Sequence, residues 1–424
     1  MAGKTINTFR AFRHRNYALF FSGQSISQIG TWMQRTAVSW MVYTMTHSAF
    51  MLGLTIFAQQ FPSFLLSLFG GILSDRYNRH KILLITQTAS MLQAVMLAIM
   101  VLTGHFQIWE IIALSIVLGV INAFDVPARQ PMIHQLISDK EDLTNALALN
   151  SAMVNMARLI GPALSGLVLQ AYGAGVCFFL NAISFLAVIT SLLLMKFPAF
   201  VKPAVRKKAA AEMKEGFNYL IKTPGIGVVI LLLGILSLFV LSYDTLIPVF
   251  TKVIFNGDAA TFGYISSFMG LGAITGTLFL ASLKKGTNLK RLLVGSGIIT
   301  GLGLMLFSHM NYFPLAMVFA VITGFGVMTQ NTLCITIIQV ETAPELRGRM
   351  MSYIALAYFG MLPLGSLITG AASQWIGAPN TMLCQGVLSL VIVAAFFKSL
   401  RKEQLPEQNG NELEEAEAVA AEKV

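Results

Sequence analysis

Residues 70–81 read GGILSDRYNRHK and lie between two long apolar runs, residues 50–73 and 82–103. Each run has about 20 residues, which is enough to cross a bilayer as a helix. A connection this short makes the two helices antiparallel neighbours, and its cations place it on the cytoplasmic side of the membrane. The stretch therefore predicts a transmembrane hairpin with a charged cytoplasmic turn. The charged residues of that turn include Asp75, Arg76, Arg79 and Lys81.

The order of residues in this turn resembles the signature loop between the second and third helices of the major facilitator superfamily. Asn78 stands where that family often has glycine, and Asn also tolerates a positive φ. An ordinary cytoplasmic hairpin needs only Lys and Arg, so an acid at Asp75 favours an ion-pair network with a partner helix. The matching positions are Gly71, Leu73, Asp75, Arg76, Arg79 and Lys81.

The composition excludes an ordinary soluble protein. Of the 424 residues, 55% are hydrophobic and 11% are charged, whereas soluble proteins carry about 25% charged residues. The basic residues gather before the first apolar run, in a central loop and after the last run, and the alternate loops hold almost none. We therefore expect a multi-pass protein of the cell (inner) membrane with both termini in the cytoplasm. The net charge of +10 reflects this topology, and no nucleic-acid partner is expected.

Twelve apolar runs are expected to span the membrane, arranged as an all-α membrane protein with two pseudo-symmetric six-helix bundles. The expected spans are 17–44, 50–73, 82–103, 109–130, 146–170, 174–195, 225–251, 260–283, 290–308, 313–338, 349–373 and 379–398. The expected domains are a cytoplasmic tail (1–16), the first bundle (17–195), a basic cytoplasmic linker (196–224), the second bundle (225–400) and a second cytoplasmic tail (401–424). Residues 209–220 read either as an amphipathic helix on the membrane surface or as a solvated linker helix.

Internal repetition supports two related bundles. The polar stretch DKEDLTNALALNS enters the fifth span, and TAPELRGRMMSYI enters the eleventh. Asp142 and Glu345 are each expected to start their helix as acidic caps. Both spans then carry a proline beside glycines, Pro162 in the fifth and Pro363 in the eleventh.

Two opposite charges lie at matching depths in the first and seventh spans, Arg35 and Asp244. A charge at the bilayer centre costs roughly 2.5–3.5 kcal/mol, so each needs a partner or a watery cavity. We expect an Arg35–Asp244 pair that closes the outward side, or else two charges solvated separately in the cavity. Asp244 is also the best candidate to carry a coupling proton, because a carboxylate shielded from water can titrate near physiological pH.

A second group of charges is expected to form an inner gate near the cytoplasmic surface. Asp125 and Arg129, at i and i+4, share a helix face within reach of the signature loop. The alternative is a static latch with no gating role. The corresponding residues of the second bundle are Glu341, Arg347 and Arg349.

The fifth span reads RLIGPALSG and resembles the glycine–proline motif of facilitator exporters that work by antiport. Gly161, Pro162 and Gly166 match that motif, and its upstream glycine is absent. Small residues let this helix approach a neighbour closely. Arg158 either faces the cavity and attracts an anionic substrate, or neutralises a carboxylate of its own bundle, with Asp125 nearest in sequence.

Uncharged polar residues complete the expected substrate cavity, although each could equally be interhelical glue worth about 1 kcal/mol. They are Gln24, Gln28, Asn155, Gln330, Asn331 and Tyr358. The sequence holds no catalytic constellation, phosphate-binding loop or metal-ligand spacing, so we expect neither an enzyme nor a cofactor. The expected partners are a small-molecule substrate, a proton and the lipid bilayer, with the chain acting as a monomer.

Three stretches resemble the branch of the superfamily that holds bacterial enterobactin exporters and macrolide-efflux proteins. They are FRHRNYALFFSGQSISQIGTWMQ, NALALNSAMVNMARLIGPALSG and ELRGRMMS. The resemblance implies a proton-coupled exporter of a drug or siderophore-like molecule, working by alternating access. The alternatives are an importer or facilitator of a metabolite or lipid-like solute, and a receptor or scaffold that transports nothing.

Overall fold

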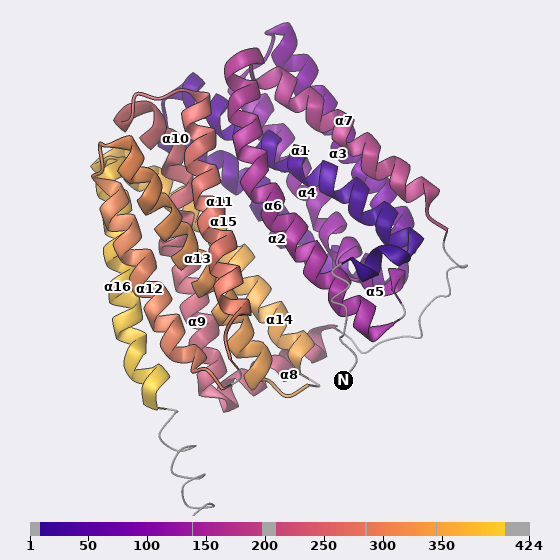
Figure 1. Ribbon diagram of the computed structural model, residues 1–424, viewed down its shortest axis with the longest axis vertical. Helices are drawn as coiled ribbons and strands as arrows, with labels where there is room; N and C mark the ends of the chain where they lie inside the picture. The colour runs from indigo at the N-terminus through magenta and orange to yellow at the C-terminus, as the bar shows by residue number, and fades with distance from the viewer. Residues whose placement is uncertain (1–8, 138, 197–208, 285, 345, 403–424) are drawn as a thin grey trace, which may run out of the picture.

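The computed structural model describes residues 9–137, 139–196, 209–284, 286–344 and 346–402. Within these ranges the chain is helical and contains no strand (Figure 1). Half of the expected first tail, much of the linker and nearly all of the second tail lie outside the described residues.

The helices of residues 9–196, here called the N-terminal half, follow the expected runs. They are the 3-10 turn η1 (Arg10–Arg13), α1 (Arg15–Thr46), α2 (Ala49–Arg76), α3 (Arg79–Thr103), α4 (Ile108–Arg129), α5 (Met132–Leu136), α6 (Lys140–Tyr172) and α7 (Ala174–Leu194).

Residues 209–402, the C-terminal half, form the remaining elements. They are α8 (Ala209–Lys222), α9 (Pro224–Phe239), the 3-10 turn η2 (Leu241–Leu246), α10 (Ile247–Val249), the π turn η3 (Phe250–Ile254), α11 (Ala259–Ala281), α12 (Leu289–Ser308), α13 (Phe313–Glu341), α14 (Arg347–Ala355), the π turn η4 (Leu356–Gly360), α15 (Met361–Ile376) and α16 (Ala378–Lys402).

Eleven helical segments of the described chain are long and apolar enough to cross a membrane. α1 is not among these eleven, although it covers the expected run 17–44 and has 32 residues. Its buried face is rich in polar side chains, among them Gln24, Ser27 and Gln34, and these keep its hydropathy below that of the other segments.

Local capping corrects two expectations about helix ends and leaves a third untested. Asn78 has φ −66° and caps α3, because its side chain accepts hydrogen bonds from the amides of His80 and Lys81; it does not supply a left-handed turn. α6 is capped by Asp139, and Asp142 lies in its first turn. α14 begins after Leu346 with no side-chain cap, and Glu345 lies outside the described residues.

The seventh expected span is interrupted where Asp244 lies. α9 ends at Phe239, and the chain continues as η2, α10 and η3. Pro248 explains the break, because it has no N–H and its ring would clash with the carbonyl of residue 244, four positions earlier. Irregular backbone at membrane depth is tolerated where it is buried in protein or lines a cavity.

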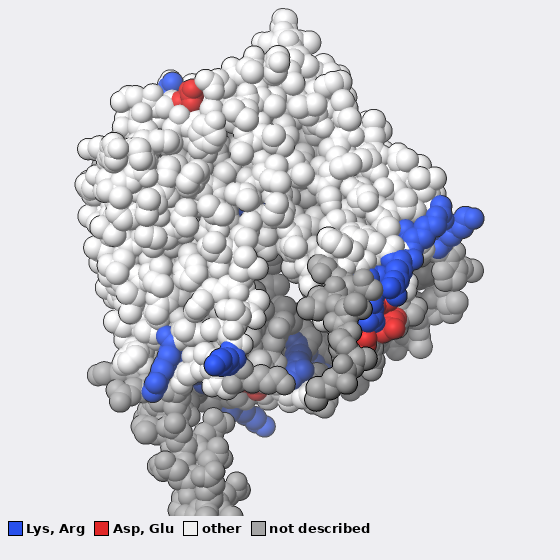
Figure 2. Space-filling model, in the orientation of Figure 1, with Lys and Arg blue, Asp and Glu red and all other residues white. Residues whose placement is uncertain are grey.

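The two halves lie side by side in Figure 1, in contact at its upper side and apart at its lower side. We call the lower side, where α1 begins and α16 ends, the terminal side, and the upper side the distal side. Figure 2 shows the visible face hollowed at its lower edge between the halves, with most of the basic groups near that edge.

Missing contacts at the terminal side agree with this separation. A Cβ built on Gly71, near the end of α2, or on Gly348, near the start of α14, would meet no atom within 4 Å. Leu65, Leu68 and Phe69 of α2 are exposed, whereas residues nearer its start are buried. The terminal part of α2 is therefore not packed against the C-terminal half.

On the distal side the halves touch through two close helix crossings. In the first, α6 crosses α11, and a Cβ built on Gly263 would lie 2.6 Å from the carbonyl oxygen of Pro162. In the second, α2 crosses α15, and a Cβ on Gly53 would lie 2.3 Å from the carbonyl oxygen of Ser366. Both distances are too short for any side chain, so glycine is required at each crossing.

We predict that Gly263→Ala destabilises the protein by about 1–3 kcal/mol, the usual cost of overpacking. Gly295→Ala on α12 is the matched control, because its Cβ would meet nothing within 4 Å and alanine favours a helix by about 0.8–1.0 kcal/mol over glycine. The two variants should shift the thermal denaturation midpoint in detergent in opposite directions. Equal shifts would contradict the crossing.

Candidate functional site

A small polar cavity lies between the halves, beside the distal crossings. Its volume is about 40 Å³, enough for one or two water molecules. Elements of both halves supply its walls. The charged, aromatic and hydroxyl residues lining it are Trp32, Arg35, Thr36, Ser39, Arg158, Tyr243, Asp244, Phe262 and Ser266.

Arg35 and Asp244 face each other across this cavity. The Nη2 atom of Arg35 on α1 is 3.8 Å from the Oδ2 atom of Asp244 on η2. Their side chains are 36% and 49% exposed, so both remain reachable by water entering the cavity. Asp244 lies in the irregular segment before Pro248, and the pair is an ion bridge between the two halves.

Arg158 of α6 is a cation in the same cavity with no carboxylate of its own. Its guanidinium lies 5.8 Å from the ring centre of Trp32, and its Nη1 atom is 4.0 Å from the sulfur of Met328. No acidic side chain lies within ion-pair distance of Arg158 among the described residues. The guanidinium of Arg35 also lies over the Trp32 ring, 5.2 Å from its centre, so two cations contact one indole.

The glycine–proline motif of the fifth span packs α6 against both halves. A Cβ on Gly161 would lie 2.4 Å from the Cβ of Trp32, and one on Gly166 would lie 2.7 Å from the carbonyl oxygen of Ala259. Pro162 lines the cavity. The motif therefore sets how closely α6 lies to α1 and α11.

Asp125 is buried inside the N-terminal half, with its side chain 5% exposed. Its carboxylate accepts hydrogen bonds from Thr86 at 2.9 Å and Gln87 at 2.7 Å, and Arg129 lies 3.3 Å away. Arg129 also approaches the Oε1 atom of Gln24 at 3.4 Å. These bonds join α1, α3 and α4, so Asp125 pairs with Arg129 rather than with Arg158.

The signature loop is held by bonds within its own half. Arg79 pairs with Asp75 at 3.0 Å and donates to the carbonyl of Ser74, whose hydroxyl donates to the carbonyl of Pro127 on α4. The loop is thus fixed to the end of α4. Its remaining predicted residues are the half-buried Gly71 and the exposed Arg76 and Lys81.

The predicted charges of the second half also find partners within that half. Glu341, at the end of α13, pairs with Lys290 of α12 at 3.0 Å. Arg347 donates to the carbonyl of Thr342 at 3.2 Å. The structure therefore does not bring Glu341 together with Arg347.

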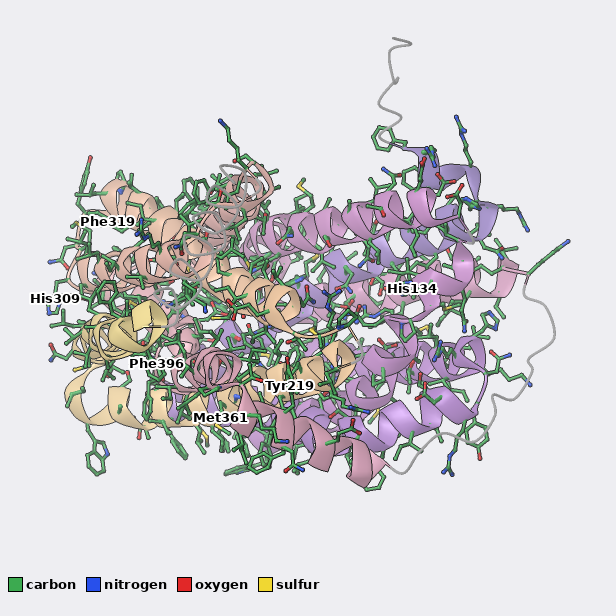
Figure 3. The ribbon with its side chains drawn as sticks, turned by 90° about the horizontal axis from the view of Figure 1, so that it is seen from below. His134, Tyr219, His309, Phe319, Met361 and Phe396 are labelled. Carbon is green, nitrogen blue, oxygen red and sulfur yellow. The ribbon has the colours of Figure 1, made fainter. Side chains whose placement is uncertain are left out.

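Arg349 pairs with Glu215 of the linker helix α8 at 2.7 Å. Tyr219 packs against the larger hydrophobic core cluster, which includes residues of both halves, and Figure 3 shows it among the helices of the C-terminal half at the terminal side. Phe217 and Ile221, on another face of α8, are 55% and 65% exposed. α8 is therefore amphipathic, with one face docked on α14 and an apolar pair left uncovered.

The other predicted cavity residues are dispersed. Gln28, Asn155 and Tyr358 are half-buried, and Asn155 donates to a carbonyl of its own helix. Gln330 is 1% exposed and lies beside α12 inside the C-terminal half, and neither it nor Asn331 lines the cavity described above.

Sequence reasoning missed Trp32, Tyr243 and Glu215. Trp32 lies three residues before Arg35, one helical turn away, and this spacing was a usable signal. Tyr243 precedes Asp244 and is 3% exposed. Glu215 had no signal, because its partner is 134 positions away in the sequence.

Comparisons with known proteins give a consistent picture. The family model described as "Transmembrane secretion effector" matches residues 6–423. The staphyloferrin A transporter of Staphylococcus aureus is 29% identical over 399 residues, which cover 92% of this chain and 98% of that protein. The enterobactin exporter EntS of Shigella boydii is 26% identical over 399 residues, covering 92% and 93%.

Solved structures share the fold. The nucleoside transporter NupG superposes with a TM-score of 0.66 at 15% identity, covering 91% of this chain and 98% of that one. An inward-facing, unoccupied bacterial homologue of the human lysosomal transporter Spinster superposes with a TM-score of 0.69 at 14% identity, covering 91% and 97%.

We predict that Asp125→Asn lowers the stability of the N-terminal half by about 1–3 kcal/mol, because it removes the charge that neutralises a mostly buried Arg129. Asp75→Asn is the control, since that i,i+4 pair is half exposed and worth about 0.3–0.5 kcal/mol. Thermal denaturation in detergent measures both. A larger loss in the control would contradict this assignment.

Proposed function

We propose that this chain exports a small siderophore-like molecule by alternating access. The chain belongs to the transmembrane secretion effector family and is a membrane transporter of the major facilitator type. In this mechanism the two halves rock about a site near the bilayer midplane. The cavity that holds Arg35, Arg158 and Asp244 is our candidate for that site. The named substrates of its relatives support the substrate class.

We further propose twelve membrane spans in two six-helix bundles, with α1 as the twelfth span and the terminal side in the cytoplasm. The length of α1, its place beside α6 and α7 and the gathering of basic residues at the terminal side support this orientation. On this assignment the structure is an inward-open state, because the halves are apart at the terminal side and packed at the distal side.

The observation that carries the proposal is the ion bridge between Arg35 and Asp244. It joins the two halves beside the distal crossings, so it must break when that side opens. Asp244 is the one carboxylate among the described residues lining the cavity. We therefore assign proton exchange to Asp244: a proton enters as the substrate leaves. A potential of 100 mV contributes about 2.3 kcal/mol for each charge moved.

Arg158 supports a substrate with an acidic group. A guanidinium at membrane depth needs an anionic or watery partner. The described neighbours of Arg158 are Trp32, Met328 and the phenol of Tyr243, and none of them carries a negative charge. A carboxylate or similar anion entering from the terminal side would complete its coordination. The flat face of Trp32 would pack against the rest of that substrate.

We assign the inner gate to the signature loop and the start of α14. In the inward-open state these groups bond within their own halves, and closing the terminal side would bring Asp75 toward the arginines of α14. Asp125 and Arg129 then act as a static support beneath the loop rather than as an interhalf pair.

Import or facilitated diffusion is the alternative function of this protein, and a receptor that transports nothing is a further alternative.

We predict that adding a siderophore or a lipophilic drug to inverted vesicles collapses a preset pH gradient with the wild-type protein and not with Asp244→Asn. Glu110→Gln is the matched control, because this exposed carboxyl caps α4 and Gln preserves the cap. Collapse that persists in Asp244→Asn would remove Asp244 from the coupling role. Substrate uptake into right-side-out vesicles instead would favour the import alternative.

We predict that Arg158→Gln weakens substrate binding by about 10- to 100-fold, the usual loss for a hydrogen bond to a charged group, and that Arg158→Lys retains part of the affinity. Quenching of tryptophan fluorescence on adding substrate measures binding, because Trp32 touches Arg158. Unchanged affinity in Arg158→Gln would show that the substrate does not contact this residue.

A further inference from the structure

Two glutamine side chains cross between the halves at the distal surface. The Nε2 atom of Gln170, in the last turn of α6, donates to the Oδ2 atom of Asp258 at 2.7 Å. The Nε2 atom of Gln374, in the last turns of α15, donates to the Oγ atom of Ser48 at 2.6 Å. Each bond links the end of one helix to the residue that starts a helix of the other half.

The two bonds occupy matching places in the two halves. Asp258 is the N-cap of α11 and Ser48 is the N-cap of α2. Both glutamines lie three positions before a glycine with positive φ, Gly173 at 81° and Gly377 at 82°.

The same offsets relate the glycines of the crossings. Each glutamine lies four positions after a crossing glycine, Gln170 after Gly166 and Gln374 after Gly370. Each N-cap lies five positions before a crossing glycine, Ser48 before Gly53 and Asp258 before Gly263. A Cβ on Gly166 would lie against the carbonyl of Ala259, and one on Gly370 against the carbonyl of Ala49. The same arrangement, a glycine crossing followed by a glutamine bound to an N-cap residue, therefore occurs twice on the distal side.

Each N-cap keeps its own helix end satisfied without the glutamine. Asp258 accepts from the amide and the hydroxyl of Thr261, and Ser48 accepts from the amide of Met51. Separating the halves would therefore break the interhalf bonds and leave α11 and α2 capped. A bond of this kind can open and close repeatedly without fraying a helix.

We propose that Gln170 and Gln374 are positioning residues for transport, forming two distal latches that set how often the distal side opens. The proposal rests on the alternating-access part of the proposed function. Neither glutamine lines the polar cavity, so the latches act through the closeness of the helix crossings rather than by touching substrate. Because both bonds are solvent-exposed, losing one should change the ratio of open to closed distal states by about twofold to tenfold.

The two latches differ in charge, which gives a sharp test. The amide of Thr261, and then its hydroxyl, hold the pKa of Asp258 below its usual range, so that latch has an ionised acceptor at neutral pH. Gln170→Glu would set two carboxylates against each other and open the latch. Gln374→Glu keeps its bond, because the Ser48 hydroxyl can donate to a carboxylate. The same substitution is therefore disruptive at one latch and tolerated at the other.

The experiment follows labelling of Ser39→Cys by a membrane-impermeant maleimide from the distal face of right-side-out vesicles. Ser39 lines the cavity on the distal part of α1. Cys384 is exposed, whereas Cys177 and Cys334 are buried, so the background carries Cys384→Ser. The variants are Gln170→Glu, Gln374→Glu, Gln170→Glu with Asp258→Asn, and Gln170→Ala with Gln374→Ala.

We expect faster labelling in Gln170→Glu and in the double alanine variant, and near wild-type labelling in Gln374→Glu. Asp258→Asn should restore slow labelling to Gln170→Glu, because Asn caps a helix as Asp does and its amide donates to Glu. Equal rates in Gln170→Glu and Gln374→Glu, or no rescue, would overturn the latches. A merely structural role would lower the melting temperature without this charge-specific pattern.

The pH-gradient assay with inverted vesicles separates this proposal from its premise. If a siderophore collapses the gradient with the parent protein while the latch variants label like the parent, transport by alternating access stands and the latches fail. If a siderophore leaves the gradient intact and all variants label alike, the proposed function fails, and the latches fail with it.

Discussion

The structure depends on how closely two pairs of helices approach each other on one side of the molecule. Where α6 meets α11 and α2 meets α15, glycines bring backbone against backbone, and attraction between helices in lipid comes mainly from such packing. This contact shrinks the polar cavity to the size of a water or two and holds Arg35 within reach of Asp244. At the other side the same helices diverge, and the charged groups there bond within their own halves.

The distribution of charge separates structural groups from candidate functional ones. Asp125 has three donors around it and is almost fully buried, as expected of a carboxylate that stabilises the packing of its half. The three charged residues of the polar cavity are partly exposed. The carboxylate of Asp244 is the one negative group there, and the guanidiniums of Arg35 and Arg158 are two positive groups. One carboxylate therefore serves two cations, and Arg158 has only uncharged neighbours, among them Trp32 and Met328.

The sequence predicts helices far better than it predicts partners. Most expected spans agree with the observed helices within a few residues, because long apolar runs bounded by Gly, Asn and Asp have one stable form in a bilayer. The seventh and eleventh are the exceptions, because 3-10 and π turns interrupt them. The proximity of Arg35 and Asp244 could be anticipated from equal depth in symmetry-related spans. The partners of Arg349 and Glu341 could not, because they depend on where α8 and α12 dock. Pro248 in the sequence predicts a break in the seventh span. The contact between Asp244 in this broken segment and Arg35 is seen in the structure.

The N-terminal half begins and ends at one place. The side chain of Asn16 donates to the carbonyl of Lys196 at 2.8 Å and accepts from its amide at 3.3 Å, so the start of α1 is tied to the residues just after α7. Every helix of this half has been synthesised once the ribosome passes that point. At about 5–20 residues per second, the rest of the chain takes roughly 10–45 s to follow. The N-terminal half thus has time to fold in the membrane before α11 and α15 are synthesised, and these two helices then pack against its surface.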